Sequence, residues 1–446
     1  MTEDYRALTL GDAYNVSNVL PLQGEDLIKY YYDLSKVRKT EAIDGVNFIL
    51  SSAEAGKTQT ILFTGHRGGG KTTELRRLEK KLKDEYFIIY FMADEELDIN
   101  DARYIDLYLV IIKQVEDSLR KRNISLDKKL LKSFEDWFKE ITKEEEQTVE
   151  GSIRMEAGGQ LGNEMPIPFL AKLWVKLLAQ MKGSAKNKVR IRETLERDIS
   201  RLKADINALL RDGTKKLRKK DPKYKGILII IDNLDRVPPP VGEHLFFDYA
   251  AQLQELDCNI IYTVPISVVY SPKNVGNTFD QNPHILPMVN IYQFDRHKID
   301  LQYNNRHLWA MADIINKRVN VDILFDSKEE LLLKIAKASG GHVRQLMRIM
   351  RTVCFTAGSR GHSKINVDDV DYGIKQEQFS FERVIPHEHY QILAEVCHSK
   401  NLENKETAQD VLYNTSVLEY NGSNRWNYVN PVIKHSDLFK EALKSL

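Results

Sequence analysis

The segment TGHRGGGKTT, residues 64–73, decides the fold of this chain. Gly65, Gly70, Lys71 and Thr72 occupy the fixed positions of the pattern GxxxxGK[ST]. The run TQTILFTG before it is typical of a short buried strand, and TTELRRLEKKLKDEYF after it is typical of an amphipathic helix. Three consecutive glycines destabilise a helix interior by about 1 kcal/mol each relative to alanine, so the bare backbone itself must be needed there. Strand, glycine-rich loop and helix in this order predict a loop whose N–H groups converge on phosphate oxygens.

The side chains of this loop define the expected ligands. We expect Lys71 to reach the β- and γ-phosphates of a nucleotide and the Thr72 hydroxyl to bind Mg²⁺. ATP and Mg²⁺ are therefore the predicted cofactors. The residues of this segment expected to contact the nucleotide are Gly65, His66, Arg67, Gly68, Gly69, Gly70, Lys71, Thr72 and Thr73.

A second motif supplies a partner for the metal ion. In KYKGILIIIDNLDRVPP, residues 223–239, an unbroken aliphatic run from Gly226 to Ile231 is typical of a strand buried on both faces of a parallel sheet. The run ends at Asp232, and ligands of open α/β sheets bind outside the carboxyl ends of strands. We therefore expect Asp232 to reach Mg²⁺ directly or through water.

Length, charge and cysteine content narrow the class of protein. With 446 residues the chain is long enough for two or three domains. Its formal net charge of +1 gives no overall attraction to nucleic acid or anionic membrane. The three cysteines lie far apart and form no CxxC pair. This pattern favours a protein of a reducing compartment and argues against a disulfide framework or a zinc site. The N-terminus lacks signal-peptide features and no run approaches about 18 apolar residues, so we expect a cytoplasmic protein without a membrane span.

The chain resembles, in FTGHRGGGKTTELRRL and IIIDNLDR, the P-loop ATPases of the AAA+/STAND assemblage. That group includes KAP-like and initiator-like branches found in bacterial and archaeal conflict systems. The resemblance implies an α/β P-loop NTPase core with a parallel sheet, a helical insertion, a helical lid and a C-terminal winged-helix module. On this sequence the four parts correspond to residues 1–100 with 223–300, 101–222, 301–380 and 381–446.

The resemblance also implies catalytic roles. Many AAA+ ATPases place a glutamate directly after the metal-binding aspartate, where it activates the attacking water. This chain has Asn233 there, and an amide cannot take a proton. Asp235 is the remaining base candidate, so the expected catalytic set is Lys71, Asp232 and Asp235. We expect slow hydrolysis, or hydrolysis completed by a neighbouring subunit, for which Arg236 is the arginine that stands out.

Three further motifs match the family, each with an ordinary structural alternative. Thr263, in the strand-like run CNIIYTV, stands where sensor 1 places a polar side chain near the γ-phosphate; a core threonine is the alternative. Arg344, in an expected helix–turn–helix over 327–357, matches sensor 2, an arginine on the nucleotide; a surface arginine is the alternative. Arg38 and Glu41 match an Arg-x-x-Glu helix before the P-loop, or a solvated ion pair.

The insertion holds the most basic part of the chain. About 130 residues separate the second expected strand, EYFIIYFMAD, from Asp232, too many for one crossover helix. Its expected parts are helices over 101–145 and 188–220, a loop or hairpin over 150–169 and an apolar, basic stretch over 170–182. The 4-3-4-3 spacing of a bundle or coiled-coil seam is formed by Leu195, Ile199, Leu202, Ile206 and Leu209. From Lys182 to Lys225 there are 16 basic and 6 acidic residues, so this block is either a solvated helix on its own domain or a docking arm for a partner protein or nucleic acid.

The C-terminal residues show helices followed by one hairpin, which predicts a winged helix. VLEYNGSNRWNYVNPVI (417–433) alternates apolar residues around Asn421-Gly422, a favoured two-residue turn. Winged helices often bind DNA, but residues 387–446 hold 6 basic and 8 acidic side chains, and 6 − 8 gives a net charge of −2. Because contacts to phosphate need positive charge, we favour an intramolecular or protein-partner role.

These features together predict an ATP-binding switch that hydrolyses ATP slowly and couples its nucleotide state to homo-oligomerisation or to a separate effector protein. The resemblance alone implies a setting in bacterial antiviral defence. The alternative is a DNA-binding initiator-like or recombination ATPase, which needs basic charge on the winged helix or the insertion. A scaffold that binds ATP without hydrolysing it is a third alternative. Nucleic acid is expected as a partner only through the basic insertion.

Overall fold

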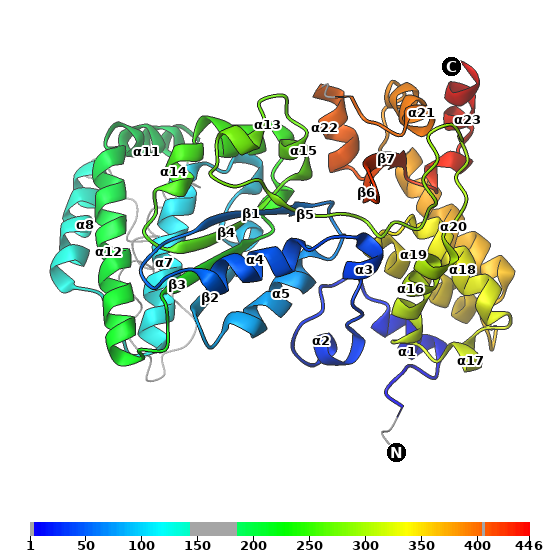
Figure 1. Ribbon diagram of the computed structural model, residues 1–446, viewed down its shortest axis with the longest axis horizontal. Coiled ribbons are helices and arrows are strands. Elements are labelled where there is room, and N and C mark those ends of the chain that lie inside the picture. The colour runs from blue at the N-terminus through cyan, green and yellow to red at the C-terminus, as the bar shows by residue number, and fades with distance from the viewer. Residues whose placement is uncertain (1–3, 143–184, 404–405) are drawn as a thin grey trace.

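A five-stranded parallel sheet forms the centre of the computed structural model, which describes residues 4–142, 185–403 and 406–446 (Figure 1). The strands follow the order β2-β3-β4-β1-β5, and every neighbouring pair is parallel. Their bounds are β1 (Thr60–Gly65), β2 (Phe87–Met92), β3 (Ile227–Asp232), β4 (Asn259–Val264) and β5 (His284–Leu286). Parallel strands direct their carboxyl ends to one edge, so β1, β3 and β4 bring the P-loop, Asp232 and Thr263 together. The predicted α/β core with a parallel sheet is confirmed.

Helices cover both faces of this sheet. They are α4 (Ala42–Ser52), α5 (Lys71–Leu82), α7 (Tyr104–Lys121), α12 (Ile199–Lys220), α13 (Pro239–Glu243) and α14 (Ala250–Gln254). Alternate side chains face opposite ways: Leu228 and Ile230 pack with α4 and α5, whereas Ile229 and Ile231 pack with α7 and α12. Burial on both faces is the physical reason for the unbroken aliphatic run in β3.

The described part of the insertion is helical: α7 and α12 pack on one face of the sheet, and further helices lie beyond them (left in Figure 1). Beside α7 and α12 it contains α8 (Lys128–Thr142) and α11 (Ala185–Arg197), and α12 packs against both α7 and α8. The predicted seam is confirmed, because Leu195, Leu202, Ile206 and Leu209 are fully buried and Ile199 is partly buried. The helical character expected over 188–220 is confirmed, as two helices, α11 and α12, that meet at Asp198. The expected segments 150–169 and 170–182 fall outside the described residues.

The lid helices and the C-terminal module lie at the opposite end of the sheet (Figure 1). The lid helices are α16 (Asn305–Asn316), α17 (Val321–Leu324), α18 (Lys328–Ser339), α19 (Val343–Ser359) and α20 (Val367–Glu382). The predicted helix–turn–helix is confirmed as α18 and α19. Its turn needs glycine, because Gly341 has a φ of 79° and a Cβ there would lie 1.9 Å from the Val289 carbonyl oxygen. The proposed domain boundaries stay predictions.

The C-terminal module has the helices and hairpin of a winged helix. Its elements are α21 (His389–Ser399), α22 (Glu406–Tyr413), β6 (Val417–Asn421), β7 (Arg425–Val429) and α23 (Asp437–Lys444). The two-residue turn expected at Asn421-Gly422 is wrong: Asn421 pairs with Arg425, so the loop comprises residues 422–424. Cross-strand packing explains this register, because the rings of Tyr420 and Trp426 stack with centroids 4.7 Å apart.

Short helices complete the fold. They include α1 (Leu10–Val16), α2 (Gly24–Tyr30), α3 (Ser35–Arg38), α6 (Ala93–Glu96) and α15 (Ile266–Val269). The helix expected to carry both Arg38 and Glu41 is wrong, since Lys39 has a left-handed φ of 51° and separates α3 from α4. Within the three described ranges, none of the helices combines the length and the apolar character needed to cross a bilayer.

Candidate nucleotide-binding site

The glycine-rich loop joins the end of β1 to the start of α5. Gly65, Gly68 and Gly70 all have positive φ, at 149°, 80° and 103°, which side-chain-bearing residues rarely adopt. Space is a second constraint at Gly68, where a Cβ would lie 2.6 Å from the His342 ring and 2.7 Å from the Arg344 Cβ. Glycine at position 68 therefore allows the lid to pack closely on the loop, in addition to exposing the N–H groups predicted to bind phosphate.

Lys71 is held inside the site by three acceptors. Its ammonium nitrogen lies 2.7 Å from the Gly65 carbonyl oxygen, 2.9 Å from that of His66 and 2.9 Å from Oδ2 of Asp235. Both side chains of the Lys71–Asp235 ion pair are almost fully buried, at 5% and 6% exposure. These three bonds match the three donors of an ammonium group, so phosphates must compete with Asp235 for Lys71.

The carboxylate of Asp232 lies at the end of β3, next to the first turn of α5. Its Oδ2 accepts from the Tyr90 hydroxyl at 2.6 Å, its Oδ1 accepts from the Asn233 N–H at 2.7 Å, and the Thr72 hydroxyl also bonds it. Burial raises the pKa of Asp232 and the neighbouring Asp235 raises it further, against the hydrogen bonds from Tyr90 and Thr72. A buried carboxylate beside a hydroxyl is a suitable oxygen pair for a hard divalent cation. Thr72 and Asp232 thus fit the predicted Mg²⁺ site.

Asn233 turns away from the catalytic position and bonds to Asp94 in the short helix α6, which follows β2. It has a left-handed φ of 61°, and its Nδ2 donates to Asp94 Oδ1 at 2.9 Å. Asp94 also pairs with Arg236 at 2.6 Å. Arg236 therefore faces a carboxylate of its own chain in this structure. The sequence motifs do not point to Tyr90 or Asp94. Tyr90 lies in β2, next to β3, and Asp94 lies in α6 just beyond the carboxyl end of β2, where polar residues collect around ligands.

Thr263 supports the turn that carries Asp235. Its hydroxyl accepts from the N–H groups of Leu234 at 3.0 Å and Asp235 at 3.3 Å, and donates to the Ile231 carbonyl at 3.1 Å. The side chain is fully buried and its hydrogen bonds go to the backbone. This arrangement corresponds to the core-threonine alternative, with the added effect of fixing Asp235.

Arginine side chains also line the pocket around the loop: Arg67, Arg236 and Arg344. Arg344 stands in the first turn of α19, and its backbone N–H donates to the Gly68 carbonyl at 3.1 Å. Burial lowers the pKa of Arg344, and the positive charges of Arg236 and Arg67 lower it further, while Asp235 acts in the opposite direction. These arginines are close enough for their positive charges to repel one another. An anion bound between them would relieve this repulsion, so the arrangement suits a phosphate.

The pocket extends beyond the predicted residues toward the N-terminus. Of the predicted set, the residues that line it are Arg67, Gly68, Gly70, Lys71, Thr72, Thr73, Asp235 and Arg344. An apolar side is formed by Val19, Leu20, Leu22, Leu34, Ile314 and Met347, with Tyr30, Tyr31 and Tyr32 nearby. Arg38 also lines the pocket and donates to the Gly69 carbonyl at 2.5 Å, so its partner is the loop and not Glu41.

The loop is bonded to the lid and to the C-terminal module. His342 places Nε2 2.8 Å from the Arg67 carbonyl oxygen, while its Nδ1 accepts from the Gln345 N–H at 3.0 Å. His66 points away from the pocket, and its Nε2 accepts from the Glu419 N–H of β6 at 2.8 Å. Burial lowers the pKa of each of these two histidines to about 3, so both are neutral at pH 7.

Comparison with known proteins agrees with this geometry. The KAP family P-loop domain matches residues 40–247, just under half of the chain. Among curated proteins, none matches the sequence.

Three solved structures are similar to this chain over most of its length, at low sequence identity. Cdc6p of Pyrobaculum aerophilum is 12% identical, with 96% of this chain and 99% of that chain covered, at a TM-score of 0.39. The ORC1 protein of Aeropyrum pernix in complex with DNA is 13% identical, with 97% and 96% covered, at 0.38, and the Drosophila ORC bound to DNA is 10% identical, with 100% and 93% covered, at 0.39. Similarities of this size carry no argument about ligands or partners of this chain. The motif geometry and the family match agree: the chain is a P-loop ATPase whose residues 40–247 are similar to the KAP family P-loop domain.

Proposed function

We propose that this protein is an ATP-driven switch, in which the phosphate-binding loop transmits nucleotide binding directly to the lid and to the winged-helix module. The observation that carries the proposal is the set of bonds made by three consecutive residues of the loop. His66 bonds β6, the Arg67 carbonyl bonds His342, and the Gly68 carbonyl bonds the Arg344 N–H. A ligand that reorders this loop therefore acts on both structures at once.

The site supports a specific mode of ATP binding. The loop N–H groups and Lys71 bind the β- and γ-phosphates, and Arg344 supplies a further positive charge from the lid. Thr72 and Asp232 hold Mg²⁺, which neutralises charge on the phosphate oxygens when it is bound. The apolar side of the pocket, between the N-terminal segment and the lid helices α16 and α19, is the part suited to the adenine ring.

Hydrolysis depends on releasing Asp235 from Lys71. In the free site these two groups neutralise each other in a buried ion pair. When phosphate oxygens take over Lys71, Asp235 becomes available as the base for the attacking water, and Asn233 keeps its bond to Asp94. A base that must first lose its partner is consistent with slow turnover.

The output of the switch is a change in the exposed surface of the lid and winged helix. We propose that this change controls homo-oligomerisation or a separate effector protein, in a bacterial antiviral defence system as the family resemblance implies. The initiator-like alternative has less support, because α22, which precedes the hairpin in the position of a winged helix's recognition helix, packs against α15, and its Tyr413 hydroxyl donates to the Arg236 carbonyl at 3.0 Å. A helix in this position is not free to read DNA.

Hydrogen–deuterium exchange tests the proposed coupling. With saturating ATP and Mg²⁺, we expect altered exchange in β6, β7 and α22, because the His66–Glu419 bond is remade when the loop closes on phosphate. The Lys71→Ala variant is the control and should show no ATP-dependent change. Exchange in β6 that is identical with and without bound ATP contradicts the switch, whatever the rate of hydrolysis.

A further inference from the structure

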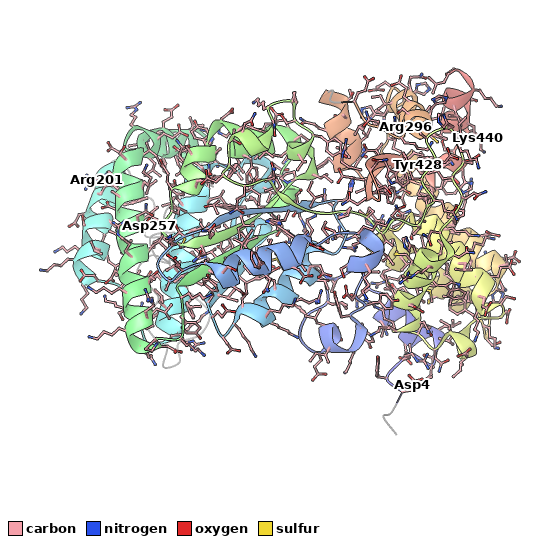
Figure 2. The ribbon with its side chains drawn as sticks, in the orientation of Figure 1. Asp4, Arg201, Asp257, Arg296, Tyr428 and Lys440 are labelled. Atoms are coloured by element: carbon pink, nitrogen blue, oxygen red, sulfur yellow. The ribbon has the colours of Figure 1, made fainter. Side chains whose placement is uncertain are left out.

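A basic groove lies at the edge of the sheet opposite to the nucleotide site. It has a volume of about 600 Å³ and opens where the adjacent strands β3, β4 and β1 begin. One wall is formed by α12, and the opposite wall by the loop that leads from α4 into β1. Figure 2 shows Asp257, which lines this groove, at that end of the sheet beside α12.

The charge of the groove is strongly positive. Its basic lining residues are Lys57, Arg211, Lys215, Arg218, Lys219 and Lys225, and Asp257 is its acidic lining residue. Three of these cations are neutralised: Lys57 pairs with Glu54, Arg211 with Asp257, and Lys225 with Glu85.

The other three cations, Lys215, Arg218 and Lys219, are exposed. None of their side chains has a hydrogen bond or ion pair to any residue within the described ranges. The groove thus presents three uncompensated positive charges in one place.

Helix stability does not account for all of these charges. Cations in the last turn of a helix interact favourably with its dipole, which explains Arg218 and Lys219 near the end of α12. Lys215 lies further back, where this effect has decayed. Arg211, Lys215 and Arg218 follow one another at four and three residues, so they share one face of α12, and this face lines the groove.

We propose that this groove binds the phosphate backbone of a nucleic acid, with Lys215, Arg218 and Lys219 as the contacting residues. The lining contains no aromatic side chain on which a base could stack, so binding is through phosphate and independent of sequence. At about 1.5 Å per residue, the row from Arg211 to Arg218 spans about 10 Å of α12. One strand of a duplex presents about three phosphates over that length.

The shape and chemistry of the groove favour a nucleic acid over an anionic membrane. Binding at a membrane surface combines positive charge with apolar side chains that enter the lipid boundary. Among the described residues, the large exposed apolar side chains all lie outside this groove. A concave basic groove instead suits the phosphate backbone of a nucleic acid.

The full-length chain tests the proposal by fluorescence anisotropy with a labelled 20-base-pair DNA duplex and an RNA duplex of the same sequence. The groove variant combines Lys215→Gln, Arg218→Gln and Lys219→Gln. A matched control removes three exposed cations of the lid and C-terminal module by Lys364→Gln, Arg383→Gln and Lys444→Gln, for the same change in net charge.

We expect the wild type to bind at least one duplex, with an affinity that falls steeply as salt rises. The groove variant should lose more than about tenfold in affinity at low salt, and the slope of log K against log salt should fall by up to about 2.7, at about 0.9 per phosphate contact. The control variant should bind like the wild type. The DNA and RNA arms identify which backbone the groove prefers.

Three results would overturn the proposal: no binding of either duplex at low salt, equal losses in the groove and control variants, or binding of phosphatidylserine vesicles with neither duplex bound. The proposal stands apart from the nucleotide switch, because the two sites lie at opposite edges of the sheet. The groove variant should therefore keep its ATP affinity, and Lys71→Ala should keep its duplex affinity, so failure of one idea does not affect the other.

Discussion

Replacing Asp235 by asparagine should tighten ATP binding while it slows hydrolysis. In the free protein Lys71 donates to Asp235 at 2.9 Å, and ATP must displace this bond before Lys71 reaches the phosphates. Asparagine keeps an acceptor but loses the charge. A hydrogen bond to a charged group contributes about 1.5–3 kcal/mol, roughly twice a neutral one, so the competing bond weakens by about 1–1.5 kcal/mol.

This difference predicts a dissociation constant for ATP that falls about five- to tenfold, since about 1.4 kcal/mol corresponds to a factor of ten. Loss of repulsion between Asp235 and the γ-phosphate acts in the same direction. Turnover at saturating ATP should fall by about a hundredfold or more, the usual contribution of a general base. Titration calorimetry with a non-hydrolysable ATP analogue measures the first effect, and phosphate release measures the second.

Asp437→Asn is a matched control, because Asp437 is 92% exposed and pairs with Lys440 at 3.1 Å, far from the nucleotide site. It should leave both constants unchanged. A folded Asp235→Asn variant with unchanged or weaker ATP affinity would refute the competition for Lys71. Full turnover in that variant would show that another group activates water, and Asp94 is then the next carboxylate to test.

Other changes in the site have separable outcomes. Lys71→Ala should abolish ATP binding with the fold retained, and Asp232→Asn should weaken binding only when Mg²⁺ is present; calorimetry with and without Mg²⁺ checks both. Asn233→Glu should lower the melting temperature without raising turnover, because this residue has a left-handed φ of 61° and faces Asp94, and strain of this kind costs about 1–3 kcal/mol. Folded-state pKa values of about 3 for His66 and His342 mean that the unfolded chain binds more protons below pH 6.5, so the free energy of unfolding should fall from pH 6.5 to 5. Denaturant titrations should show a shallower fall for His342→Gln, by up to about 1.4 kcal/mol per pH unit, and an equal slope would contradict the buried neutral state.

Local patterns in the sequence predicted the parts of the site that one segment supplies alone. The loop around Lys71, the strand ending at Asp232 and the helix–turn–helix carrying Arg344 are each encoded within about 30 residues. Their meeting at one edge follows from parallel strands, which a run of buried aliphatic strands indicates. The core and the site residues on it therefore follow from local patterns in the sequence.

Contacts between distant segments were not accessible in this way. Tyr90 bonds Asp232 across 142 positions, and His66 bonds Glu419 across 353. Nothing in the spacing of either residue marks its partner, because such pairs depend on how strands and modules pack. The hairpin loop after Asn421 was misplaced for the same reason: the turn dipeptide is a local signal, and the stacking of Tyr420 on Trp426 overrides it.

The ion pair between Lys71 and Asp235 connects two features of the chain. One is the absence of a glutamate directly after Asp232, and the other is the proposed transmission of nucleotide binding to the winged helix. The backbone N–H of Asp235 donates to the Thr263 hydroxyl, which holds the residue in place. Lys71 donates to the carbonyl of His66, and the ring of His66 bonds to β6. Withdrawing Lys71 toward phosphate must therefore disturb the backbone at His66 and free the carboxylate of Asp235 in the same movement. In the proposed switch, ATP is therefore hydrolysed only after the signal to the winged helix has been given, so that the bound state persists long enough to act on a partner.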